Sequence, residues 1–401
     1  MTTLLTVFVD GLKPESLEHM EFLDTFENKR RIKTELGYSN PCHASMYSGV
    51  YPNKHLCWFI WKYSPETSPF KWIGKLKLYR FPHNIYTKYL CYKISKIFNS
   101  RKVTSYYGIP FLWRIPINNW HYFDVAEKKF WSEPGYIENY PTIFEILKEN
   151  NIAYEIVGMS RNPAQSSIEV AKHDLVTSKS LWIYYFIGDI DPLSHRYGQD
   201  SPQTIERLKR IDNIVEIKYK ELEKKDEEAC FLFFSDHGHI KVKGEVNLYS
   251  HFRSCGESLK DYIHFIDSNY ARFWFRNEKE RRNVERVLSE LDDKGFILTN
   301  ELLQKYHVDM PDNRYGDLIF YLDVPYVFSH GEVYVLGKRM SVKNVSMHGY
   351  LPDYPESDGV LVTSSRLKGN KLIKLEDITP SILYMFNIAT PNYMDGEIIW
   401  K

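Results

Sequence analysis

The stretch LLTVFVDG at residues 4–11 carries the clearest fold signal in this chain. Apolar and β-branched residues run from Leu4 to Val9, and the first charge after them is the carboxylate of Asp10. A short run of this kind is typical of a strand that is buried on both faces of a parallel sheet. We therefore predict a first buried strand at Leu4–Val9 that places Asp10 at its carboxyl end.

Two later apolar runs repeat this arrangement and end in acidic and imidazole side chains. These are Leu181–Ile187, followed by Asp191 and His195, and Cys230–Ser235, followed by Asp236 and His237. Each group taken alone also suits a helix cap or a turn. Parallel strands, however, place ligands in the crevice beyond their carboxyl ends, so we expect these groups to meet at one edge of a sheet. Asp and His side chains gathered in this way suit Zn²⁺ or a similar divalent ion.

Amphipathic segments between the apolar runs complete an α/β pattern. The segment from Gln203 to Lys225 carries apolar residues along one stripe, and Pro141–Asn150 predicts a helix before a strand at Ala153–Val157. Near the end, Thr379 as N-cap and Pro380 at the first helical position predict one more helix. Strands that alternate with helices predict a three-layer α/β/α sandwich around a mainly parallel sheet.

Two insertions interrupt the single catalytic domain that we predict for residues 1–401. The first, 58–136, is crowded with aromatic and basic residues, and the second, 271–345, contains its own helix and strand-like runs. Between residues 62 and 114 a single acid, Glu66, stands against eleven basic residues: Lys62, Lys71, Lys75, Lys77, Arg80, Lys88, Lys93, Lys96, Arg101, Lys102 and Arg114. We interpret the first insertion as a lid and the second as a cap subdomain. The lid aromatics suit either a core of their own or a surface for an anionic, amphiphilic or glycan-linked substrate.

Composition and charge narrow the class of protein. The 52 basic and 52 acidic residues give a formal net charge of zero, and the sequence shows no nucleic-acid-binding motif. Both observations disfavour a nucleic acid partner. We found no run of about 18 apolar residues, so we expect no transmembrane segment. Peripheral membrane contact through the basic lid is a variant of the substrate interpretation.

The N-terminal run predicts a strand rather than a secretory signal. Five cysteines without a CxxC pair predict free thiols in a reducing compartment, the cytoplasm.

These motifs together resemble the alkaline phosphatase superfamily, in its type I phosphodiesterase/nucleotide pyrophosphatase branch. The matching segments span most of the chain, although the two insertions have no counterpart that we can place. They are Phe8 to Gly11, Ser39 to His55, Asp191-x-x-x-His195, Asp236-His237-Gly238, His348-Gly349-Tyr350 and the ending Asp377 to Gly396.

The resemblance implies two metal sites and a serine nucleophile. One site would use Asp191, His195 and His348, and the other would use Asp10, Asp236 and His237, with Ser39 as a further ligand. The implied cofactors are two divalent ions, Zn²⁺ with Mn²⁺ as the alternative. Two cations about 4 Å apart can stabilise both the attacking and the leaving oxygen of an in-line displacement. A serine hydroxyl needs such activation at neutral pH. The implied reaction is attack by Ser39 and hydrolysis of a phosphoserine intermediate.

Several nucleophile candidates lie close to Ser39 in the sequence. Cys42, Ser45 and Ser48 are all near, and Cys42 would suit thiol chemistry with His43. We identify no Asn or Asp partner for such a Cys-His pair. The spacing to the Gly-Val-Tyr-Pro element that ends at Pro52 favours Ser39.

One departure from the resemblance bears on the substrate. Ile60 stands where the family's nucleotide pyrophosphatases carry an Asn that contacts the phosphoryl oxygen. A Lys or Arg between Lys62 and Arg114 could stabilise the developing charge in its place.

We predict a phosphodiesterase or pyrophosphatase that acts on small phosphodiester, pyrophosphate or phospho-headgroup substrates. Alternatives are a phosphomonoesterase, a phospho-headgroup transferase, and a metal-dependent binder of phosphorylated ligands without turnover. Sulfate-ester hydrolysis is disfavoured, because the segment Ser39-Asn-Pro-Cys-His43 lacks the arginine of the sulfatase signature.

Overall fold

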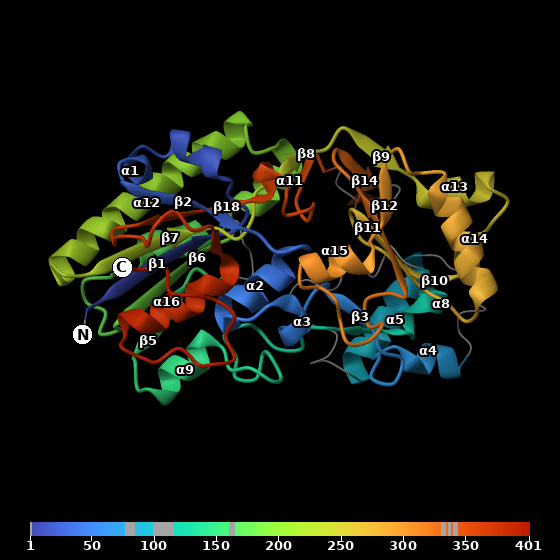
Figure 1. The fold of residues 1–401 in the computed structure, drawn as a ribbon, viewed down its shortest axis with the longest axis horizontal. Helices are drawn as coiled ribbons and strands as arrows, with labels where there is room; N and C mark the ends of the chain where they lie inside the picture. The colour runs from blue at the N-terminus through green and yellow to red at the C-terminus, as the bar shows by residue number, and fades with distance from the viewer. Residues whose placement is uncertain are drawn as a thin grey trace. The chain divides into compact units, whose positions relative to one another are not determined.

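The computed structural model describes residues 2–76, 85–98, 116–159, 165–329, 334–335, 338–339 and 344–401. The chain divides into two compact units, each built from separate segments of the sequence (Figure 1). Unit 1 comprises Met1–His55, Trp131–Lys241 and Asn344–Lys401, and unit 2 comprises Leu56–Phe130 and Val242–Lys343.

A seven-stranded sheet forms the centre of unit 1. Its strands are β1 (Leu4–Val9), β2 (Asn28–Lys33), β5 (Tyr154–Val157), β6 (Trp182–Ile187), β7 (Cys230–Phe234), β18 (Gly359–Thr363) and β19 (Ile373–Lys374). They lie in the order β19-β2-β18-β7-β1-β6-β5. β1 pairs in parallel with β6 and β7, whereas β18 runs antiparallel to both β7 and β2. The sheet is therefore mainly parallel, as predicted, and β1 has the predicted bounds.

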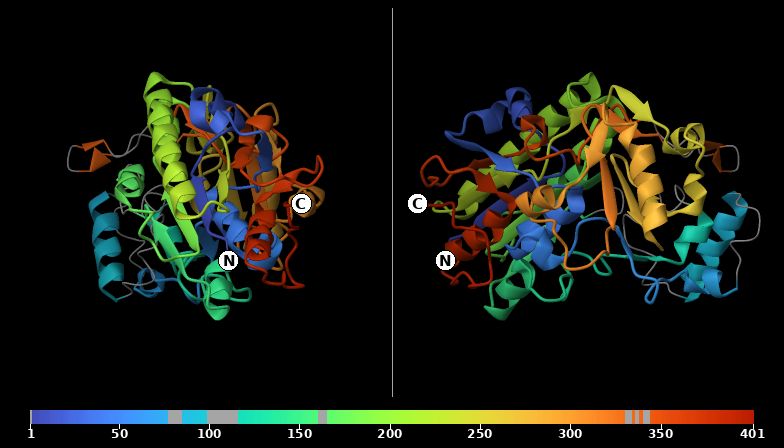
Figure 2. Two further views of the ribbon diagram at one scale, coloured as in Figure 1. Left: turned by 90° about the vertical axis from the view of Figure 1, so that its left-hand side faces the viewer. Right: turned by 45° about the vertical axis from the view of Figure 1, so that its right-hand side comes forward.

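Helices cover both faces of this sheet. They are α1 (Glu21–Asp24), α2 (Ser39–Ser48), α3 (Pro52–His55), α9 (Ile143–Glu149), α10 (Ser166–Lys172), α11 (Ile190–Tyr197), α12 (Pro202–Lys225) and α16 (Ile378–Met385). α12 lies on one side of the sheet, and α2, α9 and α16 lie on the other (Figures 1 and 2). Leu5 and Val7 of β1 pack in one core with Leu208 of α12, whereas the ring of Phe8 contacts His43 of α2. The predicted three-layer α/β/α sandwich is confirmed.

The start of α16 differs from the prediction. Asp377, not Thr379, is the N-cap, and Thr379 lies inside the helix, where its hydroxyl donates to the carbonyl of Met46 at 2.6 Å. The carboxylate of Asp377 accepts bonds from the backbone N–H groups of Lys374 and Glu397 at 3.0 and 2.7 Å. The predicted cap at Thr379 is wrong because its hydroxyl joins α16 to α2.

Unit 2 contains a four-stranded antiparallel sheet in the order β10-β11-β13-β12. Its strands are β10 (Ile263–Ile266), β11 (Tyr270–Trp274), β12 (Gly295–Ile297) and β13 (Leu318–Leu322). The other elements of unit 2 are β3 (Trp61–Tyr63), α4 (Lys71–Lys75), α5 (Ile85–Phe98), α8 (Ile117–Trp120), β4 (Phe123–Val125), β9 (Gly244–Val246), α13 (Leu248–Ser254), α14 (Glu278–Ser289), α15 (Asn300–Lys305), β14 (Tyr326–Phe328), β15 (Tyr334–Val335) and β16 (Lys338–Arg339).

The aromatic residues of the first insertion form a core in unit 2. Trp61, Phe70 and Trp120 are buried in one cluster with Phe265 and Trp274 of the antiparallel sheet. Of the two interpretations of the aromatic residues in the first insertion, this observation supports the one in which they form a core.

The two predicted insertions, 58–136 and 271–345, thus both contribute to unit 2, whose segments begin at Leu56 and Val242. A lid over the site stays a prediction. Several basic residues of this insertion lie outside the described residues: Lys77, Arg80, Arg101, Lys102 and Arg114.

Within the part of the chain that the structure describes, every helix is too short or too polar to cross a membrane.

Candidate metal centre

Three neighbouring strands deliver acidic residues to one edge of the sheet. β1, β6 and β7 are parallel and in register, so Val9 lies beside Ile187 and Phe8 beside Phe234. The chain continues from these ends into Asp10, Asp191 and Asp236. The backbone N–H of Gly11 donates to Asp236 Oδ1 at 3.2 Å, which ties the end of β1 to the end of β7.

One cluster of ligand atoms surrounds a single oxygen of Asp191. The Nε2 atoms of His195, His239 and His348 lie 3.3, 3.0 and 3.5 Å from Asp191 Oδ1. His195 and Asp191 stand one turn apart on α11, and His348 follows the short strand β17 (Ser346–Met347). Asp191, His195 and His348 are thus brought together, and His239 joins them.

A second cluster contains the remaining predicted residues. His237 Nε2 lies 3.5 Å from Asp10 Oδ1 and 3.5 Å from Asp236 Oδ2, and the Ser39 hydroxyl lies 3.2 Å from the same nitrogen. The rings of His237 and His348 stack with centroids 3.9 Å apart, which joins the two clusters. All seven residues predicted for the site therefore converge.

The imidazole rings are held with one nitrogen turned toward the carboxylates. The Nδ1 atoms of His195 and His237 each lie 3.1 Å from a backbone carbonyl, of Ser346 and of Gly238 respectively. A carbonyl only accepts, so Nδ1 carries the proton and Nε2 of the neutral ring keeps its lone pair. Backbone groups that fix the ring tautomer in this way are common behind metal ligands.

Burial and like charge shift the pKa values of the acids. Burial, with the charge of Asp236, raises the pKa of Asp10 well above its usual value. Burial likewise raises the pKa of Asp236 to about 8. Burial would also raise the pKa of Asp191, but His195 and the other imidazoles outweigh it and hold that pKa well below its usual value.

The donor set suits divalent cations. Among the described residues, buried Asp10 Oδ1 and Asp236 Oδ2 have no hydrogen-bond partner, and neither has Nδ1 of His348. A buried carboxylate oxygen without a partner is costly, and a bound cation removes that cost. Imidazole nitrogens and carboxylate oxygens are ligands that zinc accepts. The residues present therefore fit a metal centre.

The competing nucleophiles are engaged elsewhere. Cys42 is fully buried, and burial raises the pKa of its thiol well above the usual value, so it is not a thiolate. The Ser45 hydroxyl lies 3.1 Å from His55 Nε2, and the Ser48 hydroxyl donates to the Ala44 carbonyl at 2.6 Å. Of these candidates, Ser39 alone has its hydroxyl within hydrogen-bond distance of a residue of the two clusters.

Sequence reasoning missed His239. The signal was present, because His239 follows His237 after a single glycine. Two histidines at this spacing on an extended chain point to the same side, as residues i and i+2 do in a strand.

Ile60, the departure from the family pattern, is a residue of unit 2. It is partly buried and packs against the aromatic core of that unit.

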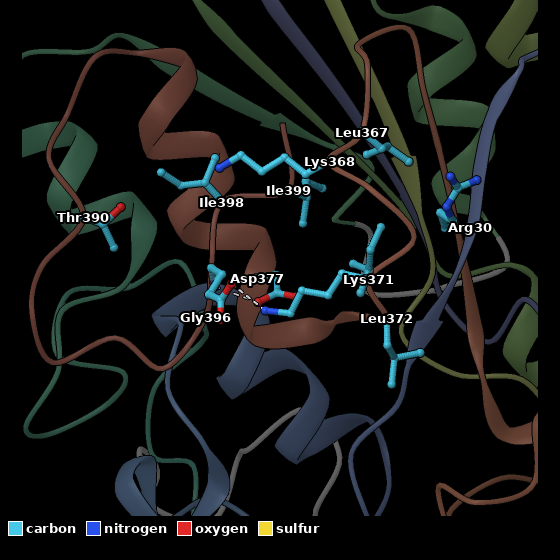
Figure 3. Close-up of a pocket in the computed structure, with 12 residues that line it drawn as sticks. Arg30, Leu367, Lys368, Lys371, Leu372, Asp377, Thr390, Gly396, Ile398 and Ile399 are labelled. Carbon is cyan, nitrogen blue, oxygen red and sulfur yellow. Dashed lines mark hydrogen bonds and ion pairs between the residues drawn. The ribbon is translucent and has the colours of Figure 1, made fainter. Parts of the chain in front are cut away.

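A separate cavity of about 350 Å³ lies near the C-terminus and contains none of the site residues. Figure 3 shows its lining, where apolar side chains alternate with Arg30, Lys368 and Lys371. Lys371 is paired with Glu397 at 2.5 Å.

The family model for type I phosphodiesterase / nucleotide pyrophosphatase matches residues 125–351, more than half of the chain. The chain belongs to this family. It is accordingly a phosphoric ester hydrolase of the alkaline phosphatase superfamily, as the sequence motifs predicted. No curated protein matches the chain significantly.

Solved structures share the fold of this family member. Human ectonucleotide pyrophosphatase/phosphodiesterase 5 has 14% identity and a TM-score of 0.66, covering 99% of this chain and 97% of its own. The murine protein, solved as an inactive threonine-to-alanine variant in complex with AMP, has 12% identity and a TM-score of 0.67, with 98% and 96% covered. A further murine structure has 12% identity and a TM-score of 0.67, with 97% and 96% covered.

Proposed function

We propose that this chain hydrolyses small phosphodiesters or pyrophosphates through a phosphoserine intermediate on Ser39, at a centre of two divalent ions. Zinc is the proposed metal, with manganese as the alternative. The observation that carries the proposal is the position of the Ser39 hydroxyl, 3.2 Å from His237 Nε2 in a cluster that also contains Asp10 and Asp236.

The ligands would divide between the two ions as the clusters do. Asp191, His195 and His348 would hold one ion, and the other would lie among Asp10, Asp236, His237 and Ser39. When bound, the two ions supply positive charge that lowers the pKa of the serine hydroxyl and stabilises the charge developing on the phosphoryl oxygens.

The protein itself orients Ser39. This residue is the first of α2, and it follows the N-cap residue Tyr38. The start of a helix presents unpaired N–H groups and a partial positive charge, which favour a phosphoryl anion. The hydroxyl of Thr379 anchors α2 through the carbonyl of Met46. The nucleophile is therefore fixed in position before the substrate arrives.

The reaction balances in two displacements. In the first, the Ser39 oxygen bonds to phosphorus and gives its proton to solvent, the bond to the leaving alcohol or phosphate breaks, and the leaving alkoxide takes a proton from solvent. In the second, a water oxygen bonds to phosphorus and the bond to Ser39 breaks. The hydroxyl of Ser39 is then restored, and two barriers replace one higher barrier.

Two alternatives remain distinct from this proposal. A phosphomonoesterase or headgroup transferase would use the same nucleophile with another substrate or acceptor. A binder without turnover would need no serine beside the second cluster, so the position of Ser39 favours an enzyme.

The first test replaces Ser39 by Ala. We expect hydrolysis of bis(p-nitrophenyl) phosphate to fall by a factor of about 10³ or more, because the nucleophile is lost while the Asp and His ligands stay. Bound zinc, measured by elemental analysis, should remain near two ions per chain. Ser48→Ala, a buried serine of the same helix, should keep activity. Full activity of Ser39→Ala would refute the assignment, and p-nitrophenyl phosphate as the better substrate would favour the monoesterase.

A cytoplasmic location is also proposed. It is supported by the five cysteines, all of which are free thiols. Imaging of a fluorescent fusion would test it, and a signal confined to a secretory compartment would contradict it.

A further inference from the structure

His239 faces the first cluster with a free lone pair. Its Nδ1 lies 3.2 Å from the hydroxyl oxygen of Ser346, and that hydroxyl donates its own proton to the carbonyl of Ser194 at 2.5 Å. The Ser346 oxygen can therefore only accept, and His239 Nδ1 must be the donor. Nε2 of the neutral ring then has no proton, although it lies 3.0 Å from Asp191 Oδ1.

A neutral imidazole cannot donate a hydrogen bond from that nitrogen. The side chain of His239 is fully buried, and a buried ring is less costly in its neutral form than as a cation. Two lone pairs, on His239 Nε2 and on Asp191, thus face each other at hydrogen-bond distance. A cation between them makes this contact favourable.

The spacing of the ligand atoms suits one tetrahedral ion. With metal–ligand bonds of about 2.0–2.1 Å, neighbouring ligand atoms around tetrahedral zinc lie about 3.3 Å apart. The Nε2 atoms of His195, His239 and His348 lie 3.3, 3.0 and 3.5 Å from Asp191 Oδ1. The three rings also lie within 4.7–5.1 Å of one another, measured between centroids.

The backbone fixes His239 beside His348. His239 precedes β8 (Ile240–Lys241), which pairs antiparallel with β17, and Ile240 is the partner of Met347 in this ladder. The next pair outward in that register is His239 and His348. Gly11 leaves room for the ring, because a Cβ at this position would lie 3.1 Å from His239 Nε2.

We propose that His239 is a fourth protein ligand of the ion held by Asp191, His195 and His348. The inference rests on the proposed two-metal function and refines it. Zinc in proteins is most often bound by four ligands, so His239 would complete the coordination of the ion at Asp191.

The test compares His239→Gln with the wild-type chain, using Zn²⁺ in competition with a chelator and Co²⁺ as a spectroscopic probe. We expect zinc affinity at one of the two sites to fall by about 10- to 100-fold or more. We also expect the strong visible absorption of four-coordinate cobalt to weaken and shift. His55→Gln, a buried histidine of unit 1 outside both clusters, should leave both readouts unchanged.

A second variant distinguishes whether His239 binds the ion or only orients Asp191. Ser346→Ala removes the partner of Nδ1 and keeps Nε2, so the cobalt band should keep its position while affinity falls less than in His239→Gln. Circular dichroism of the metal-free variants checks that they fold. If His239→Gln does not fold, the folded Ser346→Ala variant decides: wild-type zinc affinity refutes the inference, and a lower affinity with an unchanged cobalt band supports it.

The same measurements distinguish an error in the proposal for His239 from an error in the proposed two-metal function. If wild-type protein binds two zinc ions and cleaves the diester while His239→Gln keeps the wild-type affinity and cobalt spectrum, only the inference falls. If wild-type protein binds no zinc, the proposed function falls with it.

Discussion

At the residue scale, the site contains buried polar and charged side chains, whose burial costs free energy unless a cation is bound. The carboxylates of Asp10 and Asp236 are buried and close to each other, and burial and like charge raise both pKa values. The sequence predicted these residues because each follows an apolar run. His239 was missed although it follows the same apolar run as His237, because its role depends on a hydrogen bond to Ser346 that only the folded chain forms.

Replacing Asp236 by Asn tests this cost directly. Without metal, the variant should be more stable than wild type by about 1–3 kcal/mol at pH 8–9, because a buried carboxylate is replaced by a neutral amide. With zinc, the order should reverse, because the wild-type chain gains more from the ion. Urea unfolding with and without zinc measures both, and Asp200→Asn, an exposed acid, is the control. A metal-free variant that is less stable than wild type would contradict the argument.

At the element scale, apolar strands were predictable and polar ones were not. β7 is a continuous apolar run and β1 is apolar except for Thr6, whereas β2 reads Asn-Lys-Arg-Arg-Ile-Lys and has a single fully buried residue, Ile32. Its place in the sheet comes from pairing with β18, which no local pattern reveals. The prediction of Thr379 as the N-cap of α16 was wrong for a similar reason, because the hydroxyl of Thr379 donates to the carbonyl of Met46 in α2.

The turn before α16 carries a buried acid that makes stability depend on pH. Burial raises the pKa of Glu376 from 4.5 to about 7, despite the nearby Lys374. A carboxyl whose pKa is higher in the folded chain stabilises the fold below its unfolded pKa, and this contribution is lost as pH rises through about 7.

We therefore expect Glu376→Gln to lose less stability than wild type between pH 5 and pH 8. Thermal unfolding at both pH values measures the difference. Glu227→Gln, at an exposed position, should behave like wild type. Equal pH dependence in Glu376→Gln and wild type would show that Glu376 is not the source.

At the scale of the whole molecule, one centre is assembled from segments that lie far apart in the sequence. Asp10, Ser39, Asp191 and His348 all come from unit 1, although the chain leaves this unit twice to form unit 2. The parallel order of β6, β1 and β7 brings the segments together. The α/β class and the strand-end residues were therefore predictable, whereas the pairing of the two insertions in unit 2 depends on contacts between distant aromatic residues.

The stereochemical course at phosphorus distinguishes attack by Ser39 from direct attack by water. A chiral phosphorothioate diester is hydrolysed by the zinc-loaded chain in isotopically labelled water, and the configuration of the product is determined. Two successive in-line displacements, first by Ser39 and then by water, each invert phosphorus, so we predict net retention. Net inversion would mean a single attack by water and would contradict the role of Ser39.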